Sequence, residues 1–252
     1  MNGFFTYGYN LPEGSGYALY SVTHIILIVL SIVMIVGIIM FCRTGRGKSG
    51  RIARRITAII PIVLMIMRWV FVAVSNVAFI SELPLHLCSM TGMLCLLYEL
   101  TSHDSFFGSV LGQALFALCL PGAVMAILFP DATYYPAWHF ITVESFLFHV
   151  FITAYIIVML IDGSIRPDIG EAYKSILFLF VIVPPVMIFD HRFGTNYMFL
   201  NGPSNGSPLT IFYESGGYGG YLVAYGLIAL AVIILMNAAG FFIINLRQKK
   251  AS

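Results

Sequence analysis

Charged residues are scarce in this chain. Asp, Glu, Lys and Arg make up only 10% of its 252 residues, whereas soluble globular domains carry about 25%. A surface so poor in charge cannot face water over its whole area. The composition therefore excludes a soluble enzyme, a nucleic-acid-binding protein, a disordered chain and a separate water-soluble domain.

Cysteine is also scarce, and no pair of cysteines has CxxC spacing. The four cysteines lie in or at the ends of apolar stretches: Cys42, Cys88, Cys95 and Cys119. A disulfide framework is not expected. The HExxH motif is absent, and His139, Glu144 and His149, spaced five apart, do not share one helix face. We expect neither a metal nor a cofactor.

Long apolar runs dominate the chain instead. The residue types AVILMFWYC account for 60% of the sequence. They concentrate in seven runs that cover about two thirds of the chain, long enough for spans of roughly 17–25 residues: 17–42, 52–80, 83–100, 106–129, 137–161, 173–189 and 218–246. Because backbone groups in lipid must be satisfied within the segment, the spans should be helices. The sequence predicts a single-domain, all-α integral membrane protein with seven transmembrane helices.

The basic residues predict an orientation. Eleven of the thirteen lysines and arginines lie in three segments, 43–55, 166–174 and 247–250, and seven spans place all three on one side. Since short cytoplasmic loops attract Lys and Arg, we expect the N-terminus outside and the C-terminus inside. With no cleavable signal peptide evident, we expect a bacterial plasma membrane. The basic loop could also contact anionic lipid headgroups, but a topology signal alone explains it.

Prolines and one long loop interrupt this pattern. Pro121-Gly122 and Pro184-Pro185 fall inside apolar runs and should kink or break their helices. The loop at 190–217 has turn residues at both ends but an apolar middle, Tyr197–Leu200. We expect this middle segment to pack into the outer half of the bundle rather than face solvent.

Polar residues inside the predicted spans cluster at one depth. Several ionisable side chains and one thiol lie between the outer boundary and the midplane: His24, Arg68, His86, Cys88, His139, Glu144 and His149. Such residues are costly in lipid, so their one-sided placement predicts a polar cavity open to the outer leaflet. Arg68 and Glu144 are either a structural charge pair or substrate-binding groups. For His24, a ring satisfied by a backbone carbonyl is the favoured interpretation.

Cys88 lies at a depth that suits acyl transfer. It is four residues past Pro84, or about 6 Å below the helix start, near the ester level of the outer leaflet. A thiol nucleophile needs a base, which is usually a histidine. His139 has a similar predicted depth and His149 lies deeper.

Three segments resemble a known family. They are LPLHLC (Leu83–Cys88), FP…YYP (129–136) before a histidine-bearing helix, and GTNYMFLNGPSNGSPL (Gly194–Leu209). They look like segments of the YwaF-like bacterial integral membrane proteins. That family is similar to the eukaryotic transmembrane protein 164 group, a membrane acyltransferase that remodels ether phospholipids. It more distantly resembles the androgen-induced membrane hydrolases of fatty-acid esters.

The resemblance implies a site and an activity. Cys88 would be the nucleophile, with His149 favoured over His139 as its partner, and Asn196 and Tyr197 would line the site.

His86, Arg68 and Glu144 are further substrate-binding candidates. The expected function is a lipid acyltransferase or transacylase that forms an acyl-thioester, with membrane lipids as its partners and no nucleic acid; the oligomeric state is left open. A small-solute or lipid transporter, a binding protein without catalysis, and an accessory subunit remain alternatives.

Overall fold

The computed structural model describes residues 3–45, 47–75, 77–203, 207 and 209–251. Within these ranges the chain forms seven main helices, with α4 and α5 counted as one, and no strand. The helices are α1 (Val22–Thr44), α2 (Lys48–Val74), α3 (Leu87–Leu100), α4 (Phe106–Ala114) continued by α5 (Leu120–Leu128), α6 (Phe140–Ile161), α7 (Tyr173–Phe193) and α8 (Thr210–Ala251). Short 3-10 turns are Gly3–Phe5, Gly8–Asn10, Phe79–Ser81, Ile169–Glu171 and Tyr197–Phe199.

Six of the seven helices are long and apolar enough to cross a membrane. The exception is α3, which has 14 residues and is about 21 Å long at 1.5 Å per residue, short of a 30 Å hydrocarbon core. The apolar run at 83–100 includes an irregular segment before α3, and the run at 52–80 extends past the end of α2. The prediction from hydropathy therefore counted apolar loop residues between α2 and α3 as parts of the spans.

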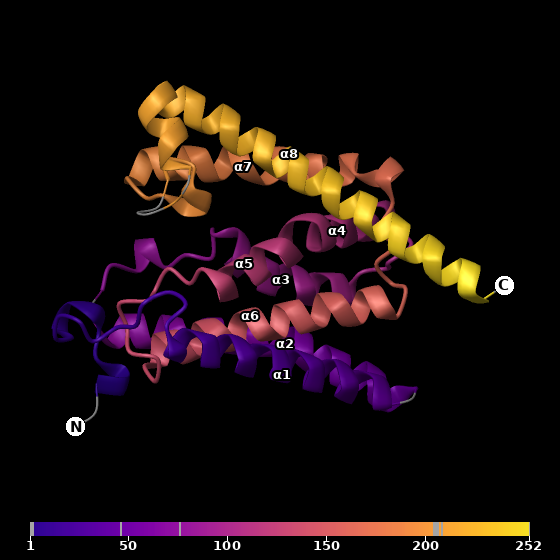
Figure 1. Ribbon diagram of the computed structural model, residues 1–252, viewed down its shortest axis with the longest axis horizontal. Helices are drawn as coiled ribbons and strands as arrows, with labels where there is room; N and C mark the ends of the chain where they lie inside the picture. Colours follow the sequence, from indigo (N-terminus) through magenta and orange to yellow (C-terminus); the bar gives the residue numbers. More distant parts are fainter. Residues whose placement is uncertain (1–2, 46, 76, 204–206, 208, 252) are drawn as a thin grey trace.

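The centre of the bundle is α6. It packs against α1, α2, α3 and α5 and is buried along most of its length. On one flank lie α1 and α2, and on the opposite flank α7 and α8 (Figure 1). α4 and the turn that follows it contact both α7 and α8, so the outer helix pair is attached mainly through this segment.

The helix formed by α4 and α5 changes its winding before Pro121. A π-helical turn, Leu115–Cys119, joins the two parts, and Pro121 falls at the start of α5. Proline has no N–H to donate to the preceding turn, and a π turn absorbs such a defect. The expected break is therefore present as a π turn. By contrast, α7 runs through Pro184 and Pro185 without interruption.

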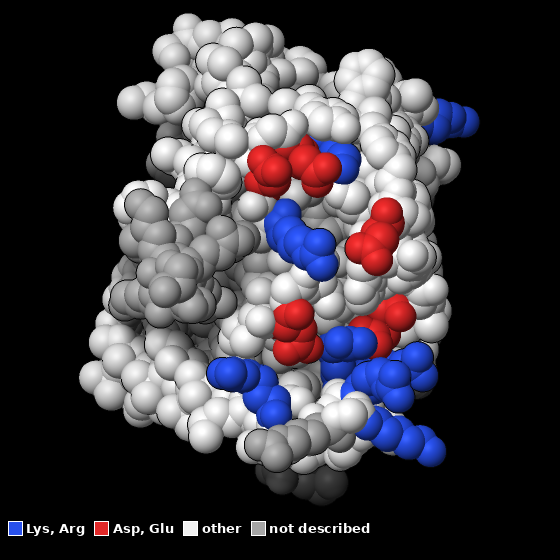
Figure 2. Space-filling view, turned by 90° about the vertical axis from the view of Figure 1, so that its right-hand side faces the viewer, with Lys and Arg blue, Asp and Glu red and all other residues white. Residues whose placement is uncertain are grey.

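The three basic segments lie at one end of the bundle. The turn between α1 and α2, the connection from α6 to α7 and the C-terminal end of α8 are all at the right in Figure 1. Figure 2 looks onto this end, where basic and acidic side chains gather. Ion pairs here join Arg54 to Glu99 and to Asp162, and Lys174 to Glu171. Which side of a membrane this end faces stays a prediction from the charge bias.

Candidate functional site

Cys88 lies in the first turn of α3, at the end of the bundle opposite the basic segments. His86, in an extended conformation (φ −70°, ψ 145°), precedes the helix, which begins at Leu87. Of the four cysteines, all of them in the described part of the chain, Cys88 alone is not buried. A helix N-terminus carries a partial positive charge that stabilises a thiolate. Its place at a helix start and its partial exposure distinguish Cys88 from the other three thiols.

The ring of His86 is held by the loop after α7. Its Nδ1 accepts a hydrogen bond from the Met198 N–H at 3.3 Å, and its ring centroid is 4.9 Å from that of Tyr197. Because Nδ1 accepts, the neutral ring carries its proton on Nε2. The negative charge of Asp131 favours the protonated ring of His86 and opposes ionisation of the Cys88 thiol. Desolvation raises the pKa of the Asp131 carboxyl, and His86 opposes that rise.

Tyr197 and Asp190 fix the loop that reaches His86. The Tyr197 hydroxyl donates to the Ile80 carbonyl at 2.6 Å and accepts from the Leu83 N–H at 2.8 Å. Asp190 Oδ1 accepts from the Tyr197 N–H at 2.9 Å and from the Thr195 hydroxyl at 2.6 Å. Both residues are buried. Tyr197 therefore ties the loop to the segment before α3 instead of presenting its hydroxyl to a cavity.

Asn196 also serves the loop itself. Its Nδ2 donates to the Gly202 carbonyl at 3.0 Å, and its Oδ1 accepts from the Asn201 N–H at 2.9 Å. Both polar groups of the amide are thus engaged within the loop. A role as a hydrogen-bond donor to substrate would require this loop contact to open.

The backbone beside His86 is strained. Met198 and Phe199 have φ angles of +52° and +57°, in the left-handed region that bulky residues seldom occupy. Two tyrosines of α8 hold this conformation: Tyr225 donates to the Met198 carbonyl at 3.1 Å and Tyr221 to the Phe199 carbonyl at 2.5 Å. Strain that persists under such restraint is typical of functional sites.

The two histidines of the α6 region have different hydrogen bonds. His139 caps α6: its Nδ1 accepts from the Ile141 N–H at 3.1 Å, and its Nε2 lies 2.8 Å from the Thr6 carbonyl. Neither ring nitrogen is left free. His149 Nδ1 lies 2.7 Å from the Ser145 carbonyl, which can only accept, so the proton is on Nδ1 and the lone pair on Nε2. This Nε2 is buried, with no hydrogen-bond partner among the described residues.

Arg68 joins two carboxylates. Its Nε lies 2.8 Å from Glu82 Oε2, and its Nη1 lies 3.3 Å from Glu144 Oε2. Glu82 precedes α3 and also places its carbonyl 2.9 Å from the Trp69 indole nitrogen. The arginine on α2 thus links α6 to the segment that leads into Cys88. Arg68 and Glu144 do form the charge pair considered from the sequence, with Glu82 as an added member.

The structure brings together some of the predicted residues and leaves others apart. His86 contacts the loop after α7 at Tyr197 and Met198, and Arg68 pairs with Glu144. Cys88 packs against the core cluster instead of against that loop. Within the described residues, no hydrogen bond joins Cys88 to a histidine. A 460 Å³ pocket at this end is lined by Ser75 and by apolar side chains of the N-terminal segment, α2 and α6, and not by these polar groups.

Sequence reasoning missed three acidic residues near the site: Glu82, Asp131 and Asp190. Two of them had a signal in the sequence, since Glu82 directly precedes the LPLHLC segment and Asp131 directly follows Phe129-Pro130. Asp190 ends an apolar run and reads as an ordinary boundary residue. Its Oδ2 is buried and has no partner in the described part of the chain.

Comparison with known families gives one match. The TMEM164 family model matches residues 19–237. The chain belongs to the TMEM164 family. No curated protein and no solved structure matches it significantly. The TMEM164 match includes the first turn of α3, all of α6 and the loop after α7, so it covers every residue of the candidate site.

Family membership places the chain among membrane proteins of the TMEM164 type, while the likeness to the YwaF-like bacterial proteins stays a prediction. Among the residues that the structure describes, no group of three or more His, Cys, Asp or Glu side chains has metal-binding geometry. The chemistry that these side chains could perform is nucleophilic and acid–base.

Proposed function

We propose that this TMEM164 family member is a membrane-embedded acyltransferase that acts on phospholipid or related lipid esters through Cys88. The Cys88 thiolate attacks the ester carbonyl carbon, a C–S bond forms and the C–O bond to the lyso-lipid breaks. The thiol proton passes to a histidine and then to the departing alkoxide. An acceptor hydroxyl next attacks the thioester, and its proton returns to the cysteine sulfur.

The position of Cys88 is the observation that carries this proposal. It is the one cysteine that is not buried, and it occupies the first turn of a helix. A helix N-terminus stabilises a thiolate, but Cys88 also packs against the apolar core, so its deprotonation needs a base. The family match, together with the LPLHLC segment and its resemblance to the transmembrane protein 164 group, supports ester chemistry over an inert cysteine.

The two histidines would take different roles. His149 is the candidate base, because its Nε2 lone pair has no hydrogen-bond partner in the described structure. His86 is a candidate donor to the oxyanion, because its Nδ1 already accepts from Met198 and its proton is therefore on Nε2. Catalytic hydrogen bonds are often long without substrate and tighten in the complex, so His149 would approach Cys88 as the lipid binds.

The membrane leaflet in which the proposed acyl transfer would occur is inferred from the same distribution of basic residues as the orientation. Cys88 is at the end opposite the basic segments, and those segments are predicted to face the cytoplasm. The proposed acyl transfer would therefore occur in the outer leaflet.

Acyl transfer can be tested with cysteine variants of the full chain in lipid nanodiscs. A phospholipid with a labelled acyl chain is supplied with a lyso-lipid acceptor, and labelled product is measured. Cys88→Ala should abolish transfer, whereas Cys95→Ala, at a buried position of the same helix, should retain it. Full activity of the Cys88 variant would overturn the mechanism. Transport of lipid without product would favour the transporter alternative.

A further inference from the structure

We propose that Asp190 is a positioning residue: through the loop after α7, it holds His86 as the neutral tautomer whose proton is on Nε2. The inference rests on the proposed function in one respect, the use of that proton as a hydrogen-bond donor to the oxyanion. The tautomer itself is a property of the folded chain and can be measured without any acyl transfer.

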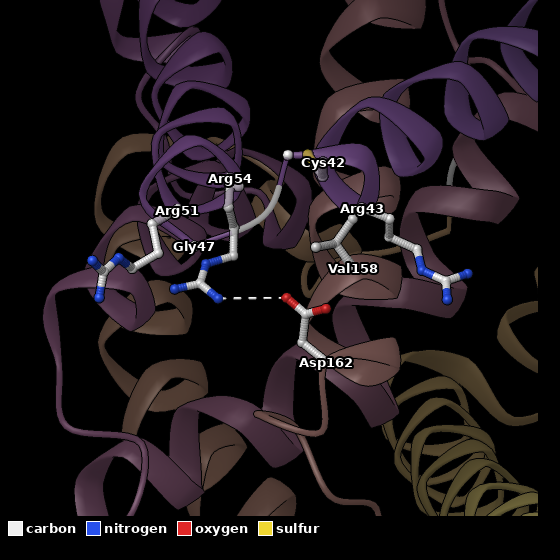
Figure 3. Close-up of a pocket in the computed structure, with 9 residues that line it drawn as sticks. Cys42, Arg43, Gly47, Arg51, Arg54, Val158 and Asp162 are labelled. Atoms are coloured by element: carbon white, nitrogen blue, oxygen red, sulfur yellow. Dashed lines mark hydrogen bonds and ion pairs between the residues drawn. The ribbon is translucent and has the colours of Figure 1, made fainter.

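The carboxylate of Asp190 is buried without a cationic partner. Asp190 is 0% exposed near the end of α7, and no described Lys, Arg or His forms an ion pair with it. Other carboxylates of the bundle have an arginine. Glu144 Oε2 lies 3.3 Å from Arg68 Nη1, and Asp162 Oδ2 lies 3.5 Å from Arg54 Nη1, the pair that Figure 3 shows. Since a buried charge is costly unless it is paired or hydrogen-bonded, hydrogen bonds must stabilise Asp190.

Both hydrogen bonds to Asp190 come from the loop after α7. The helix ends at Phe193, and Gly194, with a φ of +67°, turns the chain back. Asp190 Oδ1 then accepts from the Thr195 hydroxyl at 2.6 Å and from the Tyr197 N–H at 2.9 Å. Hydrogen bonds to an ionised acceptor are roughly twice as strong as neutral ones. The carboxylate therefore fixes the orientation of the Tyr197 N–H group.

The next N–H group along the chain reaches His86. The Met198 N–H donates to His86 Nδ1 at 3.3 Å. The rings of Tyr197 and Phe199 lie beside the imidazole, with centroid distances of 4.9 and 5.7 Å. A ring nitrogen that accepts a hydrogen bond carries no proton, so the neutral ring has its proton on Nε2. Burial also lowers the pKa of His86, against the opposite effect of nearby acidic residues, and this favours the neutral ring.

Asp190 and His86 thus accept from adjacent N–H groups of one strained segment. Met198 has a φ of +52°, and Tyr225 of α8 holds its carbonyl at 3.1 Å. Without the bond to Asp190, the peptide groups of this segment can rotate toward a relaxed backbone. The Met198 N–H would then leave Nδ1, and no other described hydrogen bond would keep the proton on Nε2.

The Nε2 side of the ring is the side left for a ligand. Nε2 has no hydrogen-bond partner in the described part of the chain, and His86 is two residues before Cys88. The N–H group of a neutral imidazole can stabilise negative charge that develops on a substrate oxygen. If the proton moved to Nδ1, Nε2 would present a lone pair and this donor would be lost. Asp190 therefore controls whether His86 can donate to the oxyanion.

Nitrogen NMR of the full chain in lipid nanodiscs, with ¹⁵N-labelled histidine, reports the tautomer. The chain has six histidines, and the signals missing from His86→Gln identify His86. The wild-type protein should show a protonated Nε2 and an unprotonated Nδ1, whereas Asp190→Ala should show a mixture of both tautomers. Loss of an oxyanion donor costs roughly a hundredfold or more in kcat, so a partial loss should lower kcat for acyl transfer about tenfold with little change in KM.

Two further variants separate positioning from a general loosening of the loop. Thr195→Val is the matched control, because it removes the other donor to Asp190 Oδ1 and leaves the Tyr197 N–H in place. Asp190→Asn keeps an acceptor oxygen for that N–H. Both variants should retain the wild-type tautomer and most of the kcat.

The outcomes distinguish this inference from the proposed function. A wild-type His86 with its proton on Nδ1 would overturn the inference, and this measurement requires no variant of Asp190 that has to fold. An unchanged tautomer in folded Asp190→Ala, or equal changes in Asp190→Ala and Thr195→Val, would also overturn it. A changed tautomer with unchanged kcat would overturn the role of the Nε2 proton. A tautomer that depends on Asp190 in a protein without acyl transfer would support the inference and contradict the proposed function.

Discussion

The contacts of Arg68 allow a stability prediction of defined size. Replacing Arg68 with Met keeps most of the side-chain volume but removes the partner of two carboxylates. Glu144 is 4% exposed and Glu82 is 15% exposed at their side chains, whereas Arg68 is 31% exposed. Breaking a buried ion pair by removing one partner costs about 3–5 kcal/mol. Because Arg68 is partly exposed, we expect the lower end, about 3 kcal/mol of unfolding free energy.

Glu144→Gln provides the comparison. This change leaves Arg68 paired with both oxygens of Glu82, at 2.8 and 3.4 Å, so we expect a loss of only about 1 kcal/mol, the worth of one hydrogen bond. When Glu144→Gln is combined with Arg68→Met, it removes the buried charge of the Glu144 carboxylate that Arg68→Met alone would leave without a partner. The double variant should therefore be more stable than the Arg68→Met single variant.

The assay is reversible unfolding in mixed detergent micelles, followed by circular dichroism. All three variants are compared at one detergent composition, so differences in unfolding free energy report the network. Losses below 1 kcal/mol for Arg68→Met, or a double variant less stable than both single variants, would refute the idea that Arg68 compensates buried carboxylates. The ion pairs of Arg68 with Glu82 and Glu144 would then be hydrated and would contribute little to stability.

Two further predictions concern the histidines and the loop after α7. His149→Gln should lower acyl transfer at least a hundredfold with little change in stability, because loss of a general base costs about that much. His139→Ala should cost about 2 kcal/mol of unfolding free energy and retain activity per folded molecule, because it removes a helix cap. Equal losses of activity in the two variants would contradict the assignment of His149 as the base. Tyr197→Phe should cost about 1–3 kcal/mol by leaving Ile80 and Leu83 backbone groups unpaired, measured by the same unfolding assay, and an unchanged midpoint would contradict the proposed loop restraint.

Much of the fold follows from hydropathy, because long apolar runs have few alternatives to helices in lipid. The apolar middle of the long loop is also explained in this way: Tyr197, Met198 and Leu200 are buried in a cluster with Met90 and Val186, which confirms the expectation that this segment packs into the bundle. Hydropathy fails where an apolar segment is irregular, as before α3. The loop there contains Phe79–Ser81 in a 3-10 turn, and composition alone cannot distinguish it from a span.

The candidate site was harder to predict than the fold, because the role of a polar residue depends on its hydrogen-bond partners. His24 was expected to find a backbone carbonyl, and its Nε2 lies 3.2 Å from that of Ile127. His139, Asn196 and Tyr197 had the right residue types for a site, yet their polar atoms fix helix ends and loops. The position of a residue in the sequence predicts its depth along a helix, but its hydrogen-bond partner is known only from the folded structure.

The central claim is a covalent acyl intermediate on Cys88, and mass spectrometry tests it directly. The protein is incubated in nanodiscs with a phospholipid and no acceptor, digested, and searched for an acyl group on each cysteine peptide. We predict an acyl mass increment on Cys88 that hydroxylamine removes and that is missing from Cys42, Cys95 and Cys119. An unmodified Cys88 in a preparation that still transfers acyl chains would contradict the account.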